Sequence, residues 1–248
     1  MPRVLLCLFA ITLLVPTARA AEKHTLPEAP GAIVILLDYK GGFTPPRENE
    51  DATFTIHADG KAVVGAPFGQ SKKIEGKLTA EELQSLLAFI LEENDFFDIA
   101  TGPPIARPGL AIADAATTIL RVQADGRDEG ITYLGFGDDE RLTKLRAITT
   151  RLQKEITRLH AGGEEQIARF TEIANEQLKK AHPEAAPLTA ENLTVAQHMV
   201  DDTRRLMYQR QLPLADGTTE HVSVHFMRKP DGELMVQNVS RTVVPKRG

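Results

Sequence analysis

Cysteine, tryptophan and serine are scarce in this sequence of 248 residues. Cys7 is the only cysteine, tryptophan is absent, and aromatic residues make up 5% of the chain. A single thiol excludes an internal disulfide, a thiol redox pair and a multi-thiolate metal site. None of the few serines lies in a G-x-S-x-G motif, and the sequence contains no Gly-rich phosphate loop or dinucleotide fingerprint. The motifs by which most enzymes are recognised are therefore missing.

A strong basic character is also missing. The chain has 29 Lys and Arg against 34 Asp and Glu, a formal net charge of −5. Nucleic-acid-binding domains usually carry clustered positive charge, so we expect no nucleic-acid partner. Charged residues at 25% and hydrophobic residues at 42% are typical of a folded globular protein.

The N-terminus has the three parts of a secretory signal peptide. Arg3 precedes the apolar run 4–15, and Ala18-Arg19-Ala20 has the small-x-small pattern of a cleavage site. A membrane-spanning helix needs ~20 apolar residues, more than this run provides. We predict a signal peptide over 1–20, cleaved after Ala20, and export to the periplasm or the extracellular space; an uncleaved membrane anchor is the alternative. The mature chain then has no cysteine and no transmembrane segment, which is typical of a bacterial secreted protein.

Two similar units follow a flexible lead predicted over 21–31. Each reads strand, Asp-Gly turn, strand, helix, with turns at Asp59-Gly60 and Asp125-Gly126. The first unit has strands over 33–39, 53–58 and 62–65, and Thr79 and Glu82 form a capping box at the start of its helix. The second has strands over 117–124 and 131–136 and a helix after Asp138, with apolar residues at steps of three and four.

The chain is predicted to be α+β: an antiparallel sheet with helices packed on one face, followed by a small, mainly antiparallel β domain. We place the first domain over 32–181, including a further helix ending near Ala181 with Ile167, Phe170, Ile173 and Leu178 facing inward. The linker is 182–187 and the second domain 188–248. In the second domain, alternation predicts strands over 204–212, 220–228 and 233–243; residues 195–200 fit a strand or a short helix, and we favour a strand.

Histidines and acids are the remaining candidates for chemistry. His221 and His225 alternate with apolar residues on a predicted strand, which separates them by ~13 Å, too far to share a metal. His57 likewise belongs to the polar face of its strand. The segment 125–130 departs from the calcium-loop pattern and is interpreted as a plain hairpin. We predict no catalytic residue, no metal and no cofactor.

An acid-rich loop leaves one enzymatic alternative open. Asp38, Glu48, Glu50 and Asp51 flank it, and two carboxylates held ~5–10 Å apart are what carboxylate hydrolases use. Such a site requires a concave pocket and one carboxyl group with a raised pKa.

The same loop contains the candidate binding residues. Phe43 and Arg47 lie between glycines and prolines, and Phe68 lies between Pro67 and Gly69. Aromatic and arginine side chains often anchor interfaces, so these three residues are predicted to contact a partner. The alternative is that Phe43 folds back over the sheet.

Residues 33–97 resemble uncharacterised secreted bacterial proteins. The resemblance rests on Asp38-Tyr39-x-Gly41-Gly42-Phe43, the Asp59-Gly60 hairpin, Leu78-Thr79-x-Glu81-Glu82-Leu83 and Phe96-Phe97. It implies no established activity. The sequence therefore favours an exported, non-enzymatic module that binds a protein or peptide through an exposed loop or sheet edge. The acid-dependent hydrolase and a structural envelope protein are the alternatives.

Overall fold

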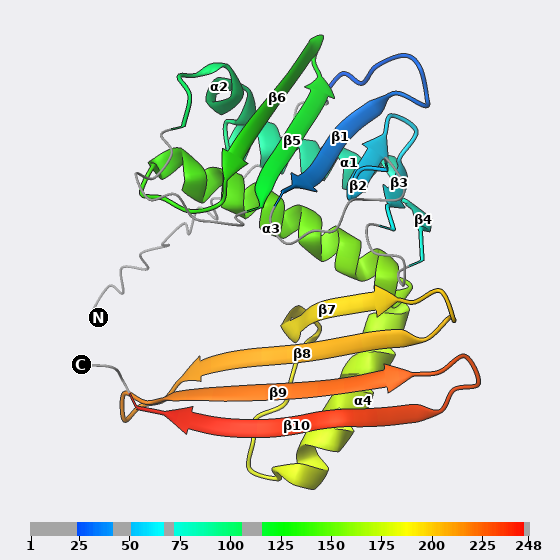
Figure 1. The fold of residues 1–248 in the computed structure, drawn as a ribbon, viewed down its shortest axis with the longest axis vertical. Coiled ribbons are helices and arrows are strands. Elements are labelled where there is room, and N and C mark those ends of the chain that lie inside the picture. Colours follow the sequence, from blue (N-terminus) through cyan, green and yellow to red (C-terminus); the bar gives the residue numbers. More distant parts are fainter. Residues whose placement is uncertain (1–23, 42–50, 67–71, 106–115, 246–248) are drawn as a thin grey trace, which may run out of the picture.

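Two antiparallel sheets and their helices make up the protein. The computed structural model describes residues 24–41, 51–66, 72–105 and 116–245. The first sheet has six strands in the order β4-β3-β2-β1-β5-β6, and the second has four in the order β10-β9-β8-β7 (Figure 1). The predicted α+β class is therefore confirmed. The predicted signal peptide and most of the lead lie outside the described residues.

The six-stranded sheet is built from two hairpins joined through the central strand β1. Its elements, in chain order, are β1 (Ile33–Lys40), β2 (Phe54–His57), β3 (Lys61–Val64), β4 (Ile74–Lys77), α1 (Ala80–Ala88), the π-helix η1 (Phe89–Glu93), α2 (Phe96–Thr101), β5 (Thr117–Ala124), β6 (Arg127–Leu134) and α3 (Glu140–Ala161). Strand β1 pairs with β2 on one side and β5 on the other, antiparallel in both cases.

Local signals fix where these elements begin and turn. Gly60 has φ +82°, and Gly126 has φ +72°, so both Asp-Gly turns use the left-handed region that glycine adopts readily. At the start of α1, the Thr79 hydroxyl accepts from the Glu82 N–H (3.1 Å) and the Glu82 carboxylate accepts from the Thr79 N–H (2.6 Å). The predicted capping box is confirmed.

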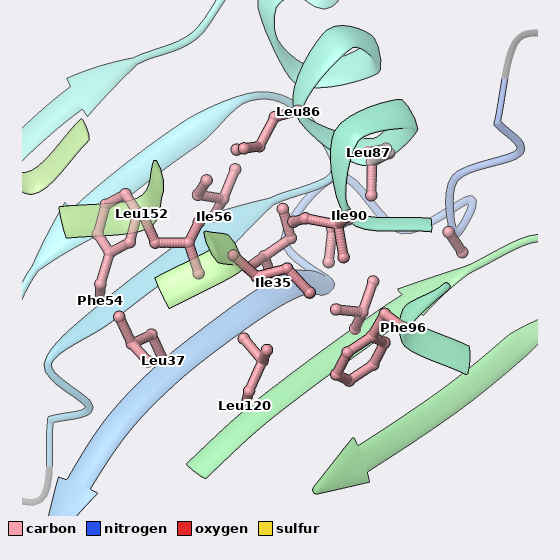
Figure 2. Close-up of a cluster of buried hydrophobic side chains, with 14 of the residues drawn as sticks. Ile35, Leu37, Phe54, Ile56, Leu86, Leu87, Ile90, Phe96, Leu120 and Leu152 are labelled. Atoms are coloured by element: carbon pink, nitrogen blue, oxygen red, sulfur yellow. The ribbon is translucent and has the colours of Figure 1, made fainter. Parts of the chain in front are cut away.

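The first core lies between this sheet and the helices α1 and α3. Figure 2 shows side chains of β1, β2 and β5 meeting side chains of the helices; the labelled residues are Ile35, Leu37, Phe54, Ile56, Leu86, Leu87, Ile90, Phe96, Leu120 and Leu152. Most of them have no exposed surface. Full burial of one such aliphatic side chain stabilises the fold by about 1.5–3 kcal/mol, so this layer carries the stability of the first unit.

The four-stranded sheet packs one face on a single helix. It contains α4 (Glu164–Ala181), the short 3-10 helix η2 (Ala190–Asn192), β7 (Leu193–His198), β8 (Arg204–Pro213), β9 (Thr219–Arg228) and β10 (Leu234–Val244). Phe170 of α4 lies 6.1 Å from the Phe226 ring, and Phe226 stacks on Tyr208 at 6.3 Å. We call the side covered by α4 the inner face, and the opposite side, which faces the viewer in Figure 1, the outer face.

Helix α4 packs against the C-terminal sheet. Its buried residues Ile167, Phe170 and Leu178 belong to the second hydrophobic cluster, together with the strand residues of β8 and β9. The two cores therefore meet near Gly162-Gly163, both with φ +94°, and α4, which the sequence analysis assigned to the first domain, packs in the second core. The linker at 182–187 stays a prediction.

Several elements differ from the sequence analysis in detail. The first helix ends in a π-helical turn over 89–93, β4 is an additional strand, and Phe96 and Phe97, both buried in the first core, begin a short helix. Residues 195–200 mostly belong to β7, so the favoured strand is confirmed. Among the described residues, no helix combines the length and apolar character needed to span a bilayer.

Candidate functional site

The three binding candidates from the sequence, Phe43, Arg47 and Phe68, lie outside the described residues. Their contact with a partner stays a prediction. Glu48 and Glu50 of the acid-rich loop also lie outside them.

The two described acids of that loop have structural contacts. Asp38 is buried in β1, and its Oδ1 accepts from the Thr53 N–H (3.0 Å) and the Thr53 hydroxyl (3.1 Å). Asp51 lies 2.8 Å from the Lys73 Nζ. The first contact links the start of β2 to β1, and the second links the end of the loop to the residue that precedes β4. They do not support a catalytic pair of carboxylates.

The predicted placement of the histidines is confirmed. His221 and His225 both lie on the outer face of β9, between buried valines and Phe226. His225 Nε2 lies 2.7 Å from Ser223 Oγ, a contact that sequence spacing did not predict. His57 Nδ1 lies 2.9 Å from the Gly31 carbonyl oxygen. In the described part of the chain, no three His, Cys, Asp or Glu side chains gather as metal ligands do.

A hollow of about 440 Å³ lies where α1, α3, α4 and β7 meet, and five carboxylates and three basic side chains line it. Arg158 lies 2.8 Å from Glu155 and 3.8 Å from Glu82. The hydrogen bond from the Thr79 backbone holds the pKa of Glu82 below its usual value, and the hydrogen bond from Lys154 does the same for Glu191. A general acid needs a raised pKa, so these carboxylates do not favour a hydrolase.

The strand at one edge of the C-terminal sheet, β7, is closed by the rest of the molecule. The His198 N–H donates to His160 Nδ1 (3.2 Å), and the His198 carbonyl oxygen accepts from the Lys72 N–H (2.8 Å). Burial, with the nearby His198 as a lesser cause, lowers the pKa of His160 to about 4. The imidazole is therefore neutral at pH 7, and its Nδ1 is able to accept this hydrogen bond.

The opposite edge strand, β10, pairs with β9 on one side only. The Lys229 N–H donates to the Glu233 carbonyl oxygen (2.9 Å) at the start of this hairpin. Backbone groups in an antiparallel ladder alternate in direction from there. The N–H and C=O of residues 234, 236, 239, 241 and 243 consequently point away from β9. No described residue outside the strand bonds to them, so β10 presents an open backbone edge along the bottom of Figure 1.

Apolar side chains are exposed near both ends of this open edge. Met235 and Val236 are 40% and 43% exposed, and Val243 and Val244 are 43% and 37% exposed. The middle of the strand is polar, with Asn238, Ser240 and Thr242 on the outer face. Arg241 is the one charged residue of β10, and it is held on the inner face.

A buried ion-pair cluster fixes β10 to the sheet. Glu220 of β9 is 4% exposed and lies 2.6 Å from Arg210 and 2.7 Å from Arg241. The hydrogen bond from Arg241, together with that from Arg210, holds the pKa of Glu220 below its usual value. Arg241 also reaches Glu184 (3.0 Å), and Arg210 donates to the Ala186 carbonyl oxygen (2.6 Å). These ion pairs thus anchor β10 to β9 and to Glu184 on the inner face.

No family model, characterised protein or solved structure matches this chain. The strand over 233–243 could be predicted from its alternating residues, but its position at an open edge of the sheet could not, because neighbours in a sheet are set by tertiary packing.

Proposed function

We propose that this chain is an exported, non-enzymatic binding module that takes an extended polypeptide segment as a fifth strand alongside β10. One observation carries the proposal: β10 is an 11-residue edge strand with exposed apolar side chains near both ends, and its outward backbone groups have no partner among the described residues. An edge of this kind is a template for β-strand addition, in which backbone hydrogen bonds give affinity and alternate side chains give specificity.

The side chains of β10 indicate the chemistry of the partner. Its exposed apolar residues suit a segment with β-branched or other apolar residues at both ends and polar residues between them. The single charge of β10, Arg241, is already bonded to Glu220 and Glu184. A highly charged segment would therefore find little compensation along this edge.

The N-terminal signal supports export. It predicts that the protein recovered from the periplasm or the medium starts at Ala21, which intact-mass measurement checks. A mature protein that still begins with Met1 would contradict this part of the proposal and favour the membrane-anchored alternative.

The edge is tested with peptides selected from a phage-displayed random 12-residue library against the full chain. Selected peptides are synthesised, and their affinity is measured by fluorescence anisotropy for wild type and for Val239→Pro. Proline at position 239 removes an N–H that points away from β9, a position where edge strands tolerate it. We expect apolar residues at alternate positions in the peptides and at least a tenfold loss of affinity in the variant.

Thr242→Ala is the matched control, because it shortens an outer-face side chain of β10 and leaves every backbone group in place. Its affinity should stay within about twofold of wild type. Equal affinity for wild type and Val239→Pro would contradict strand addition. Dimers of wild type that Val239→Pro disperses in sedimentation would instead favour a structural protein in which two copies pair through β10.

A further inference from the structure

The methionines are concentrated on one surface. Of the five in the chain, Met1 lies outside the described residues and the other four belong to the C-terminal sheet or its turns. Met207, Met227 and Met235 come from three adjacent strands. Each alternates with residues whose side chains pack on the inner face, so all three lie on the outer face.

The strand register brings these three thioethers together with one imidazole. Met207 lies directly opposite His225, and Met227 directly opposite Met235. Directly opposite residues have Cβ atoms ~4.5–5.5 Å apart, and diagonal neighbours ~7–8 Å. His225 and Met227 are two residues apart on β9, ~7 Å along the strand. Flexible methionine side chains span such separations, so all four donor atoms are able to converge above the outer face.

Ser223 orients the imidazole in this group. Its Oγ lies 2.7 Å from His225 Nε2, which leaves Nδ1 as the second ring nitrogen. Hydrogen bonding of one ring nitrogen commonly fixes the ring so that the other coordinates a metal.

The donor set selects the kind of metal. Thioether sulfur is a soft ligand that prefers Cu(I) over hard cations such as Mg²⁺ or Ca²⁺, and imidazole also suits copper. All four donors are uncharged when they coordinate, and Arg205 lies directly opposite Met227. Neutral ligands beside a guanidinium disfavour a divalent ion more than a monovalent one.

We propose that Met207, His225, Met227 and Met235 form a binding site for a soft monovalent metal cation of the Cu(I) class. The site shares Met235 with the edge strand, but it uses outer-face side chains rather than the backbone edge of β10, so metal binding does not require an added strand.

The probe is Ag(I), added as silver nitrate in chloride-free buffer to the full chain with methyl-labelled methionine. Cys7→Ser is present in every sample, so that the one thiol of the chain does not bind the metal. We expect saturation at one equivalent and shifted NMR methyl signals for Met207, Met227 and Met235. Met199 lines the same hollow as Met227 but is not one of the proposed ligands, so its methyl signal should shift less than those of the other three. Parallel shifts of all four methyl signals would overturn the proposal.

Variants give the second readout. Met207→Leu with Met227→Leu conserves side-chain volume and should weaken Ag(I) binding at least tenfold, while Met199→Leu should leave it unchanged. His225→Gln tests the imidazole separately and should also weaken binding. Zinc nitrate should not compete. Unchanged affinity in the folded double variant, judged by circular dichroism, would show that these methionines only cover apolar surface.

Discussion

The two sheets protect their edges differently, and in the part of the chain that the structure describes, only the β10 edge is neither short, charged nor covered. In the six-stranded sheet, β4 has only four residues, and β6 carries Arg127, Asp128 and Glu129 along its start. In the four-stranded sheet, β7 is closed by His160 and Lys72, whereas β10 is long, nearly uncharged and open. Natural sheets usually blunt their edges with short strands, charges or covering elements. Three edges here follow that rule, and the exception is where we place the partner.

The largest loss of stability is expected when the ion pairs that anchor β10 are removed. Glu220→Ala removes the buried carboxylate between Arg210 and Arg241, and loss of one partner from a buried ion pair costs about 3–5 kcal/mol. Because the folded-state pKa of Glu220 is lowered, its contribution is present above the unfolded pKa of about 4.5 and is lost as pH falls through the lower folded value. Urea denaturation at several pH values measures both effects.

Glu233→Ala is the control for this prediction, since Glu233 pairs with Lys229 on the exposed turn before β10. An exposed pair contributes about 0–1 kcal/mol. Similar losses for both variants would mean that the Glu220 cluster does not anchor the strand.

Acid should open the β7 edge. The unfolded chain protonates His160 near pH 6.5, but the buried imidazole resists protonation until about pH 4. The stabilising contribution is therefore complete above pH 6.5 and declines as pH falls toward 4, by on the order of 3 kcal/mol in all. The protection factors of the β7 amides, which are corrected for the pH dependence of intrinsic exchange, should fall over this interval before those of β1 and β5.

His160→Asn keeps an acceptor for the His198 N–H and removes the titrating group. Exchange of β7 in this variant should depend much less on pH between 6.5 and 4. An unchanged pH dependence would assign the effect to another group at this junction, such as His198 with its partner Asp202.

The edge strand β4 packs closely against α3 at Gly76. A Cβ at Gly76 would overlap Leu159 Cδ2, so Gly76→Ala forces the helix side chain to move and costs about 1–3 kcal/mol. Gly130 of β6 is the matched strand glycine, because a Cβ there meets only ordinary contacts at 3.6 Å. Thermal denaturation should therefore show a clear loss for Gly76→Ala and little change for Gly130→Ala; equal changes would contradict this account.

The smallest effect on stability is expected at β6. Asp128→Thr with Glu129→Thr removes the edge charges, including the exposed ion pair of Asp128 with Arg121, and should change stability by less than about 1 kcal/mol. Light scattering should nevertheless show more self-association, because the uncharged edge resembles β10. Glu165→Gln with Glu172→Gln on α4 changes the net charge equally and should not have this effect. Equal association in both pairs would indicate a net-charge effect rather than an edge effect.

Local structure could be predicted wherever a short motif determines it. The Asp-Gly turns, the Thr79 capping box and the alternation in β5, β8 and β9 all require nothing beyond neighbouring residues. Strand β4 was missed because Ile74-Glu75-Gly76-Lys77 has one apolar residue and a glycine, and it becomes a strand through pairing with β3. The stripe on α4 predicted a buried face, but no local rule says which sheet covers it.

In the candidate site, too, local features could be predicted from the sequence and tertiary features could not. The residues of β10 and the outer position of His225 could be predicted, but not the open edge or the meeting of Met207 with His225. Both depend on the order of strands and their register, which join residues up to tens of positions apart. The role of Phe43, Arg47 and Phe68 stays a prediction of the sequence.

The irregular pairing of β10 between Val236 and Asn238 has a consequence for any segment that joins it. An extra residue there resets which side chains face α4, so an incoming strand without a matching kink cannot keep step along the whole length. A segment that reaches the apolar residues at both ends of β10 therefore needs a kink of its own. A straight segment pairs in step from Asn238 to Val244, a stretch of seven residues centred on Arg241 rather than on the midpoint of the strand.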